Sequence, residues 1–264
     1  MERYVIAGGQ EGYDRLLVLS RDAWPSTSTL FAKVGIEEGM DCLDLGCGGG
    51  EVTLELARMV APEGRALGVD MDSVKLELGR QAARDRGITN VDFRQLDVNE
   101  WDDPNSHDLV YSRFLLQHLS RPLDLLGRMW NAVRAGGFLI VEDADHDGWY
   151  CHPPNRGFEF FARTLAEAID RGGGDHTFGR KLYEGFLEAG TYDPQVTLVQ
   201  SARTSGETKT LAWLTLRATK DAITSQGIAT LDEVESALED LGQLTEDPRS
   251  IIGAPRVFQV WSRR

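Results

Sequence analysis

Cysteine is scarce in this chain, which has three cysteines, Cys42, Cys47 and Cys151, among 264 residues. Cys42 falls in an expected strand and Cys47 in a glycine-rich loop, so neither reaches a disulfide partner easily. Their spacing matches no zinc-binding pattern either. We therefore expect a reduced, cytoplasmic protein without a structural metal.

Basic side chains and long apolar runs are also few. Lys and Arg number 28 against 42 Asp and Glu, which gives a formal net charge of −14. Nucleic acids and anionic membranes are bound by basic faces, so neither is an expected partner. No apolar run approaches the length of a membrane span, and the N-terminus lacks the core of a signal peptide. The expected partner is a small molecule, and a homodimer is left open.

A glycine-rich loop, D-L-G-C-G-G-G-E at residues 44–51, stands between an apolar run and an amphipathic segment. A strand that ends in such a turn and feeds a helix can cradle a ligand against bare backbone. A dinucleotide fingerprint requires a third glycine where Glu51 stands. Asp44 would also repel a pyrophosphate, whereas it would suit a ligand that carries an ammonium group.

This loop resembles the first motif of the class I S-adenosylmethionine-dependent methyltransferases, an acidic and a hydrophobic residue followed by G-x-G-x-G. Segments 68–72, 95–98, 108–113 and 133–142 follow in the order of the family's later motifs. The resemblance is close from Asp41 to Asp145 and loose elsewhere. It implies S-adenosylmethionine as cofactor and S-adenosylhomocysteine as product.

The resemblance also implies roles for residues that follow each strand. The loop glycines would approach the methionine part of the cofactor, and Asp70 would hold the ribose. Asp97 would meet the adenine, and the N-terminal segment would close the site. Alternatively, Asp70 caps the next helix and Met71 belongs to the core. The implied cofactor-binding residues are Tyr4, Arg15, Asp44, Gly46, Cys47, Gly48, Asp70, Met71, Asp97, Val98, Ser112 and Arg113.

The expected fold is α/β. Alternating apolar strands and amphipathic helices from Asp41 to Val141 predict a parallel sheet with helices on both faces. The resemblance implies a Rossmann-like, seven-stranded, mostly parallel sheet whose last strand, near 256–261, is antiparallel, together with a helical lid. Residues 143–154 are expected to form a loop.

Three regions are expected along the chain. Residues 1–38 form an N-terminal helical segment over the cofactor site, with separate helices before and after Pro25. Residues 39–145 form the S-adenosylmethionine-binding core. Residues 146–264 complete the sheet, at about 194–200 and 254–263, and insert the helical lid for substrate.

Candidate catalytic bases are His146 and His118, because a general base is needed when the methyl acceptor arrives protonated. Residues placed for substrate contact are Glu142, Trp149 and Tyr150. The acids and histidines between 143 and 152 suggest a metal site as an alternative, but they match no ligand spacing, so no metal is expected.

The expected activity is methyl transfer from S-adenosylmethionine to an O, N or C atom of a small metabolite, in the manner of enzymes of secondary metabolism. The alternative is a methyltransferase-like protein that binds the cofactor but catalyses cyclisation or rearrangement, since fold does not fix function. An NAD-dependent oxidoreductase conflicts with the glycine spacing. A nucleic-acid methyltransferase conflicts with the charge.

Overall fold

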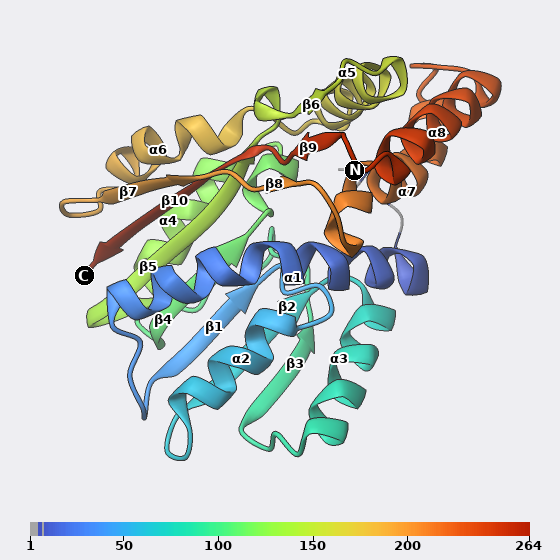
Figure 1. Cartoon of the computed structure of the whole chain (residues 1–264). Helices are drawn as coiled ribbons and strands as arrows, with labels where there is room; N and C mark the ends of the chain where they lie inside the picture. Colours follow the sequence, from blue (N-terminus) through green and yellow to red (C-terminus); the bar gives the residue numbers. More distant parts are fainter. Residues whose placement is uncertain (1–4, 7) are drawn as a thin grey trace.

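The computed structural model describes residues 5, 6 and 8–264 (Figure 1). Its main sheet has seven strands in the order β3-β2-β1-β4-β5-β10-β7, and β10 is antiparallel to both of its neighbours. The predicted Rossmann-like sheet with an antiparallel last strand is confirmed. The strands are β1 (Asp41–Leu45), β2 (Arg65–Asp70), β3 (Val91–Gln95), β4 (His107–Arg113), β5 (Val133–Asp145), β7 (Gln195–Val199) and β10 (Arg256–Arg263).

Side chains alternate between the two faces of this sheet and build two cores. Leu43 and Leu45 of β1 pack toward α4 (Pro122–Ala132) and α6 (Leu182–Glu188). Cys42, which precedes Leu43, packs on the opposite face, which α1 (Gly9–Val34) and α2 (Glu51–Val60) cover. Helices therefore lie on both faces, as Figure 1 shows. Near-continuous apolar strands are what a sheet buried on both sides requires.

Helix α3 spans Ser73–Arg86 and is capped at both ends. The Asp72 carboxylate caps its first turn by accepting from the backbone N–H of Val74 and Lys75. Gly87 ends the helix in the left-handed conformation at φ 66°. Such caps satisfy the backbone groups that a helix end leaves without partners.

The expected break at Pro25 is wrong, because α1 continues through this residue to Val34. A proline inside a helix removes one backbone hydrogen bond. Packing compensates for this loss: Leu30 and Phe31, which follow the proline, are buried against the sheet. The Ser26 hydroxyl also donates to the Ala23 carbonyl at 2.8 Å.

The loop expected at 143–154 is largely ordered instead. β5 extends to Asp145 because β10 pairs with it as far as Arg256. After one 3₁₀ turn, η2 (His146–Gly148), a small antiparallel sheet forms from β6 (Tyr150–His152), β9 (Ile251–Gly253) and β8 (Ala202–Arg203). Strands of two or three residues carry no periodic signal, so the sequence did not reveal them.

Three helices pack together beyond one end of the main sheet, α5 (Arg156–Arg171), α7 (Leu211–Ser225) and α8 (Leu231–Glu246). Their own apolar core includes Phe161, Leu216 and Leu241, and it also contains Val5 and Ile6 from the N-terminus. Within the described part of the chain, no helix combines the length and the apolar character that crossing a membrane requires.

Candidate functional site

A cavity of about 990 Å³ lies at the carboxyl edge of the parallel strands, where open α/β sheets bind ligands. One part of its wall is the loop after β1, together with Asp70 and Asp97 at the ends of β2 and β3. Another part is apolar and comes from Leu165 and Ile169 of α5. One cavity therefore joins the sheet edge to the helices beyond it.

The glycine loop supplies bare backbone to this cavity. Gly46 and Gly48 both have positive φ, at 71° and 56°, a conformation that side chains rarely tolerate. The backbone N–H of Gly48 donates to Asp70 Oδ2 at 2.8 Å, which ties the loop to the end of β2. A Cβ atom on Gly48 would lie 2.9 Å from Leu16 of α1. The loop is thus confined between β2 and α1.

The first half of α1 covers the loop and connects it to the distal helices. The Tyr13 ring lies so close to Gly49 that a Cβ there would be 2.3 Å from it. Arg15, only 9 % exposed, lines the cavity and donates from Nε to the Thr215 hydroxyl of α7 at 3.0 Å. The expected closing residue Tyr4 lies outside the described residues.

Asp44 is a buried carboxylate in the cavity wall, 3 % exposed. Burial raises its pKa to about 7, while the hydrogen bond from Thr53 and the charge of Arg113 act in the opposite direction. The Thr53 hydroxyl donates to Asp44 Oδ2 at 2.7 Å. Burial makes the ionised form of Asp44 unfavourable, and a cation beside the carboxylate would stabilise that form. This position therefore favours a positively charged ligand group.

Asp70 does not cap α3, because that cap is Asp72. Its two carboxylate oxygens instead accept from the backbone N–H groups of Gly48 and Asp72, at 2.8 and 2.9 Å. Met71 lies at the cavity wall with 62 % of its surface exposed, so it is not a core residue.

Most of the other predicted cofactor-binding positions also line the cavity. Ser112 is the exception: it is fully buried, is not part of the wall, and its hydroxyl has no hydrogen-bond partner among the described residues. The remaining predicted positions in the wall are Cys47, Asp97, Val98 and Arg113.

Two predicted substrate contacts do not line the cavity. Glu142 points to the α1 face of the sheet, where its carboxylate accepts from Thr27, Tyr111 and Gln259 at 2.6 to 2.7 Å. Tyr150 lies on β6 and is 42 % exposed, with its ring over Gly253. Trp149, the third predicted contact, is part of the wall.

His146 lines the cavity, but both of its ring nitrogens are engaged. Its Nδ1 accepts from the Trp149 indole N–H at 3.0 Å, and its Nε2 lies 2.7 Å from Gln117 Oε1. Burial lowers the pKa of His146 to about 3, helped by the charges of His118, His176 and Arg15. A histidine held neutral with an occupied acceptor nitrogen is not poised as a general base.

His118, the other candidate base, also lines the cavity. Burial lowers its pKa to about 3, and the nearby charges of Arg15 and Lys75 act in the same direction. A general base works best with a pKa near the operating pH, and neither histidine has one.

The buried polar residues of the wall that sequence reasoning missed include Gln117 of η1 (Leu116–His118) and Lys75 of α3. Gln117 is 3 % exposed and follows β4. Its position beyond the carboxyl end of a parallel strand could have indicated a ligand contact. Lys75 is 4 % exposed, with Nζ 3.6 Å from Asp72 Oδ2. Nothing in the sequence indicated that this lysine, within a largely polar helix, would be buried in the cavity wall.

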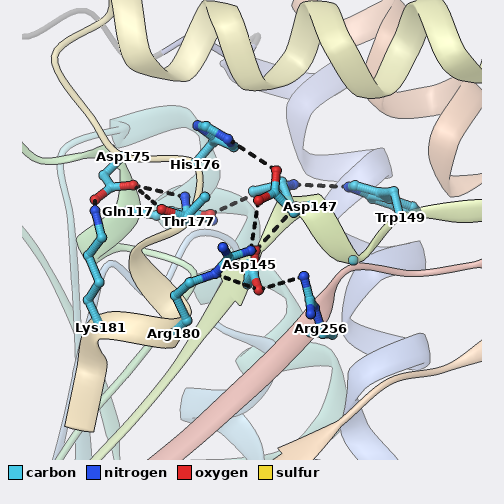
Figure 2. Close-up of polar contacts among 12 residues, drawn as sticks. Gln117, Asp145, Asp147, Trp149, Asp175, His176, Thr177, Arg180, Lys181 and Arg256 are labelled. Carbon is cyan, nitrogen blue, oxygen red and sulfur yellow. Dashed lines mark hydrogen bonds and ion pairs between the residues drawn. The ribbon is translucent and has the colours of Figure 1, made fainter. Parts of the chain in front are cut away.

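Arginine side chains contact two of the carboxylates that had suggested a metal site, Asp145 and Asp147 (Figure 2). Asp145 is contacted by Arg180 and by Arg256, whose Nη2 lies 3.0 Å from Asp145 Oδ2. Arg180 Nη2 also contacts Asp147 Oδ2 at 2.8 Å. These acids therefore brace β5, β10 and η3 (Phe178–Lys181) against one another.

Three other side chains, Asp170, Asp175 and His176, bring ligand-type atoms within 4.8 Å of one another. His176 Nδ1 is bonded to Asp170 at 2.8 Å, and Asp175 is paired with Lys181. The protein's own hydrogen bonds account for this grouping.

Comparison with known proteins places the chain in a family. The model of a methyltransferase domain matches residues 36–190, more than half of the chain. The ubiquinone/menaquinone biosynthesis C-methyltransferase UbiE of Azotobacter vinelandii is 34 % identical over 109 residues, which are 40 % of this chain and 43 % of that protein. The alignment thus spans less than half of this curated relative.

Solved structures share the fold at low sequence identity. A candidate methyltransferase from Bacillus halodurans superposes with a TM-score of 0.60 at 15 % identity, over 89 % of this chain and 97 % of that one. The [4+2]-cyclase SpnF superposes with a TM-score of 0.55 at 15 % identity, over 98 % and 97 %. The chain is therefore a member of the methyltransferase-domain family, a class I enzyme fold whose cofactor is S-adenosylmethionine.

Proposed function

We propose that this protein transfers the methyl group of S-adenosylmethionine to an O, N or C atom of a small molecule bound in the same cavity. The observation that carries the proposal is the continuity of that cavity, from the glycine loop to the apolar wall of α5. Its volume of about 990 Å³ stands at the upper end for small-molecule sites, which suits two ligands side by side.

The residues of the sheet edge fit the cofactor. Gly46 and Gly48 leave the cradle free of side chains, and Asp44 offers a buried carboxylate to an ammonium group. Asp70 would hold the ribose hydroxyls, and Asp97 the adenine amino group, both as hydrogen-bond acceptors. The bound cofactor supplies a methyl group already activated on a sulfonium.

The N-terminal segment and the distal helices would enclose both ligands. We assign residues 1–38 to closing the cofactor site, 39–145 to the cofactor-binding core and the helices within 146–264 to the lid. The Arg15–Thr215 hydrogen bond supports this assignment, because it joins α1 to α7 across the cavity wall. The protein's contribution to rate would be alignment of the two ligands and exclusion of water.

The two histidines are not assigned the role of general base. Their pKa values of about 3 keep them neutral, and Trp149 occupies the acceptor nitrogen of His146. We infer that the acceptor atom is already nucleophilic when it binds, as an enolate or phenolate carbon or oxygen is. UbiE, by its name a C-methyltransferase of ubiquinone and menaquinone biosynthesis, offers hydroquinones as a first class of acceptor to try.

The test is to incubate the enzyme with methyl-labelled S-adenosylmethionine and a panel of hydroquinones and phenols that includes acidic members ionised at the assay pH, because a typical phenol has a pKa of about 10. The proposal expects a labelled product and one S-adenosylhomocysteine per product. Conversion of a compound without release of S-adenosylhomocysteine would favour the cyclase alternative, a reaction class that the SpnF fold also hosts. Asp44→Asn, which weakens the expected ammonium contact, is the matched low-activity control.

A further inference from the structure

Three side chains in the cavity wall, Trp149, His146 and Gln117, form a chain of hydrogen bonds. The indole Nε1 of Trp149 lies 3.0 Å from His146 Nδ1, and His146 Nε2 lies 2.7 Å from the side-chain oxygen of Gln117. Figure 2 shows Trp149 and Gln117 with the surrounding polar contacts. The order of donors and acceptors along these hydrogen bonds determines which end of the Gln117 amide points into the cavity.

The direction of the chain starts at Trp149, because an indole N–H can only donate. His146 Nδ1 must therefore be the unprotonated, accepting nitrogen. Since burial keeps the pKa of His146 at about 3, the ring is neutral and its single proton resides on Nε2. That Nε2–H donates to Gln117, so the amide oxygen of Gln117 is the atom that faces the histidine.

The backbone of Gln117 is held on both sides. Its backbone N–H donates to Asp143 Oδ2 at 3.0 Å, and its carbonyl accepts from the backbone N–H of Asp175 at 2.8 Å. The amide oxygen of Gln117 accepts the hydrogen bond from His146, so the amide NH₂ group is its remaining polar group. Among the residues that the structure describes, no group accepts a hydrogen bond from it.

The side chain is nevertheless 3 % exposed and belongs to the cavity wall. A donor in a cavity wall loses its contact with water when a ligand covers it, so a ligand that supplies an acceptor there replaces the lost hydrogen bond. A ligand that offered its own N–H there would leave two donors facing each other. Such mismatches discriminate strongly between ligands that carry an acceptor and ligands that do not.

From this geometry we propose that Gln117 determines acceptor specificity by donating its amide N–H to an oxygen of the methyl acceptor. The ligand class is a compound with a carbonyl, carboxylate or phenolate oxygen, and Trp149 and His146 are positioning residues that keep the amide turned. This inference rests on the proposed function, since it names the acceptor chemistry of the same cavity.

The test uses two neutral probes with one skeleton, 1-tetralone, which has a carbonyl oxygen, and tetralin, which has none. Their affinities for the protein saturated with S-adenosylhomocysteine are measured by ligand-observed NMR. Loss of one hydrogen bond should reduce the tetralone-to-tetralin affinity ratio by about twofold to tenfold in Gln117→Met. Gln117→Glu, which presents only acceptors, should reduce the ratio at least as much.

Gln243→Met, at an exposed glutamine of α8, is the matched control and should leave the ratio unchanged. A ratio that stays the same in Gln117→Met would overturn the proposal. The tautomer gives an independent readout that needs no probe: nitrogen NMR of labelled histidine should show the His146 proton on Nε2. In Trp149→Phe the Nδ1 form should appear, because the obligate donor has gone.

A proton on Nδ1 in the unsubstituted protein would also overturn the inference, because Gln117 would then turn its oxygen to the cavity. Binding of S-adenosylhomocysteine separates this failure from that of the proposed function. If that ligand binds and the ratio does not respond to Gln117, only the specificity role is wrong. If it does not bind, the proposed function fails, and the tautomer still tests the hydrogen-bond chain.

Discussion

The backbone N–H of Gly48 donates to the carboxylate of Asp70 at 2.8 Å, so the glycine loop after β1 is fastened to the end of β2. The second oxygen of this carboxylate holds the N–H of Asp72, the residue that caps α3. One side chain thus fixes both the loop and the next helix start. The cradle is shaped before a ligand arrives, which lowers the ordering cost of binding.

Replacing Asp70 by Asn should weaken binding of S-adenosylhomocysteine. The variant loses a charged acceptor for the ribose hydroxyls and turns an N–H₂ group toward one of the backbone donors. Loss of a hydrogen bond to a charged group corresponds to roughly a tenfold to hundredfold weaker affinity. Calorimetric titration measures this change, and Asp102→Asn, at an exposed loop position, is the control. Equal affinities for the Asp70 variant and the unsubstituted protein would refute the assigned role.

Asp44 should make the protein less stable as the pH rises. Its pKa is raised to about 7 in the folded state from an ordinary value of 3.8, so the folded state resists an ionisation that the unfolded state undergoes. Stability is therefore lost between about pH 4 and pH 7. Asp44→Asn lacks this cost and should be more stable at neutral pH, on the order of a few kcal/mol. Denaturant unfolding at acidic and neutral pH measures the difference, which should vanish in acid.

The same substitution should weaken cofactor binding, because an amide does not balance an ammonium charge. In the unsubstituted protein, affinity for S-adenosylhomocysteine should fall below about pH 7, where Asp44 takes up a proton. Calorimetry across this range tests the prediction. A variant that gains stability and keeps full affinity would show that Asp44 does not face the ligand's charge.

Glu142→Gln should cost stability without affecting ligand binding. The carboxylate accepts hydrogen bonds from Thr27, Tyr111 and Gln259 in the core, and a glutamine would place an N–H₂ group against these donors. The expected cost is about 1–3 kcal/mol in the free energy of unfolding. Chemical denaturation measures it, and calorimetry should give an unchanged affinity for S-adenosylhomocysteine. A selective loss of acceptor binding with normal stability would restore Glu142 as a substrate contact.

His146 should remain neutral throughout the ordinary range of histidine titration. Burial and neighbouring positive groups lower its pKa to about 3, so its ring signals should not move between about pH 5 and 8. An NMR titration of labelled histidine follows them, and the unfolded protein in denaturant, where His146 regains ordinary behaviour, is the reference. A transition near neutral pH would contradict this prediction and would support His146 as a general base.

The sheet was predictable because its signals are local and repeated. Apolar strands alternate with amphipathic helices, and a glycine such as Gly87 marks a helix end. Asp44, Asp70 and Asp97 lie at or near the ends of three parallel strands. Because parallel strands share one carboxyl edge, their place at the cavity could be predicted.

What the sequence could not reveal depends on contacts between distant segments. Whether α1 breaks at Pro25 is decided by packing of Phe31 on the sheet. The side of β5 to which Glu142 points depends on strand register, and its three partners come from elements far apart in the chain. The burial that lowers the pKa of His118 and His146 comes from packing between segments that are far apart in the chain.

The most direct test of the account is a calorimetric titration of the protein with S-adenosylmethionine and, separately, with S-adenosylhomocysteine. We expect one site for each, with dissociation constants on the order of micromolar, and weaker binding by Asp44→Asn and Asp70→Asn. Absence of heat with both ligands, in protein shown to be folded, would contradict the assignment of the cavity to this cofactor.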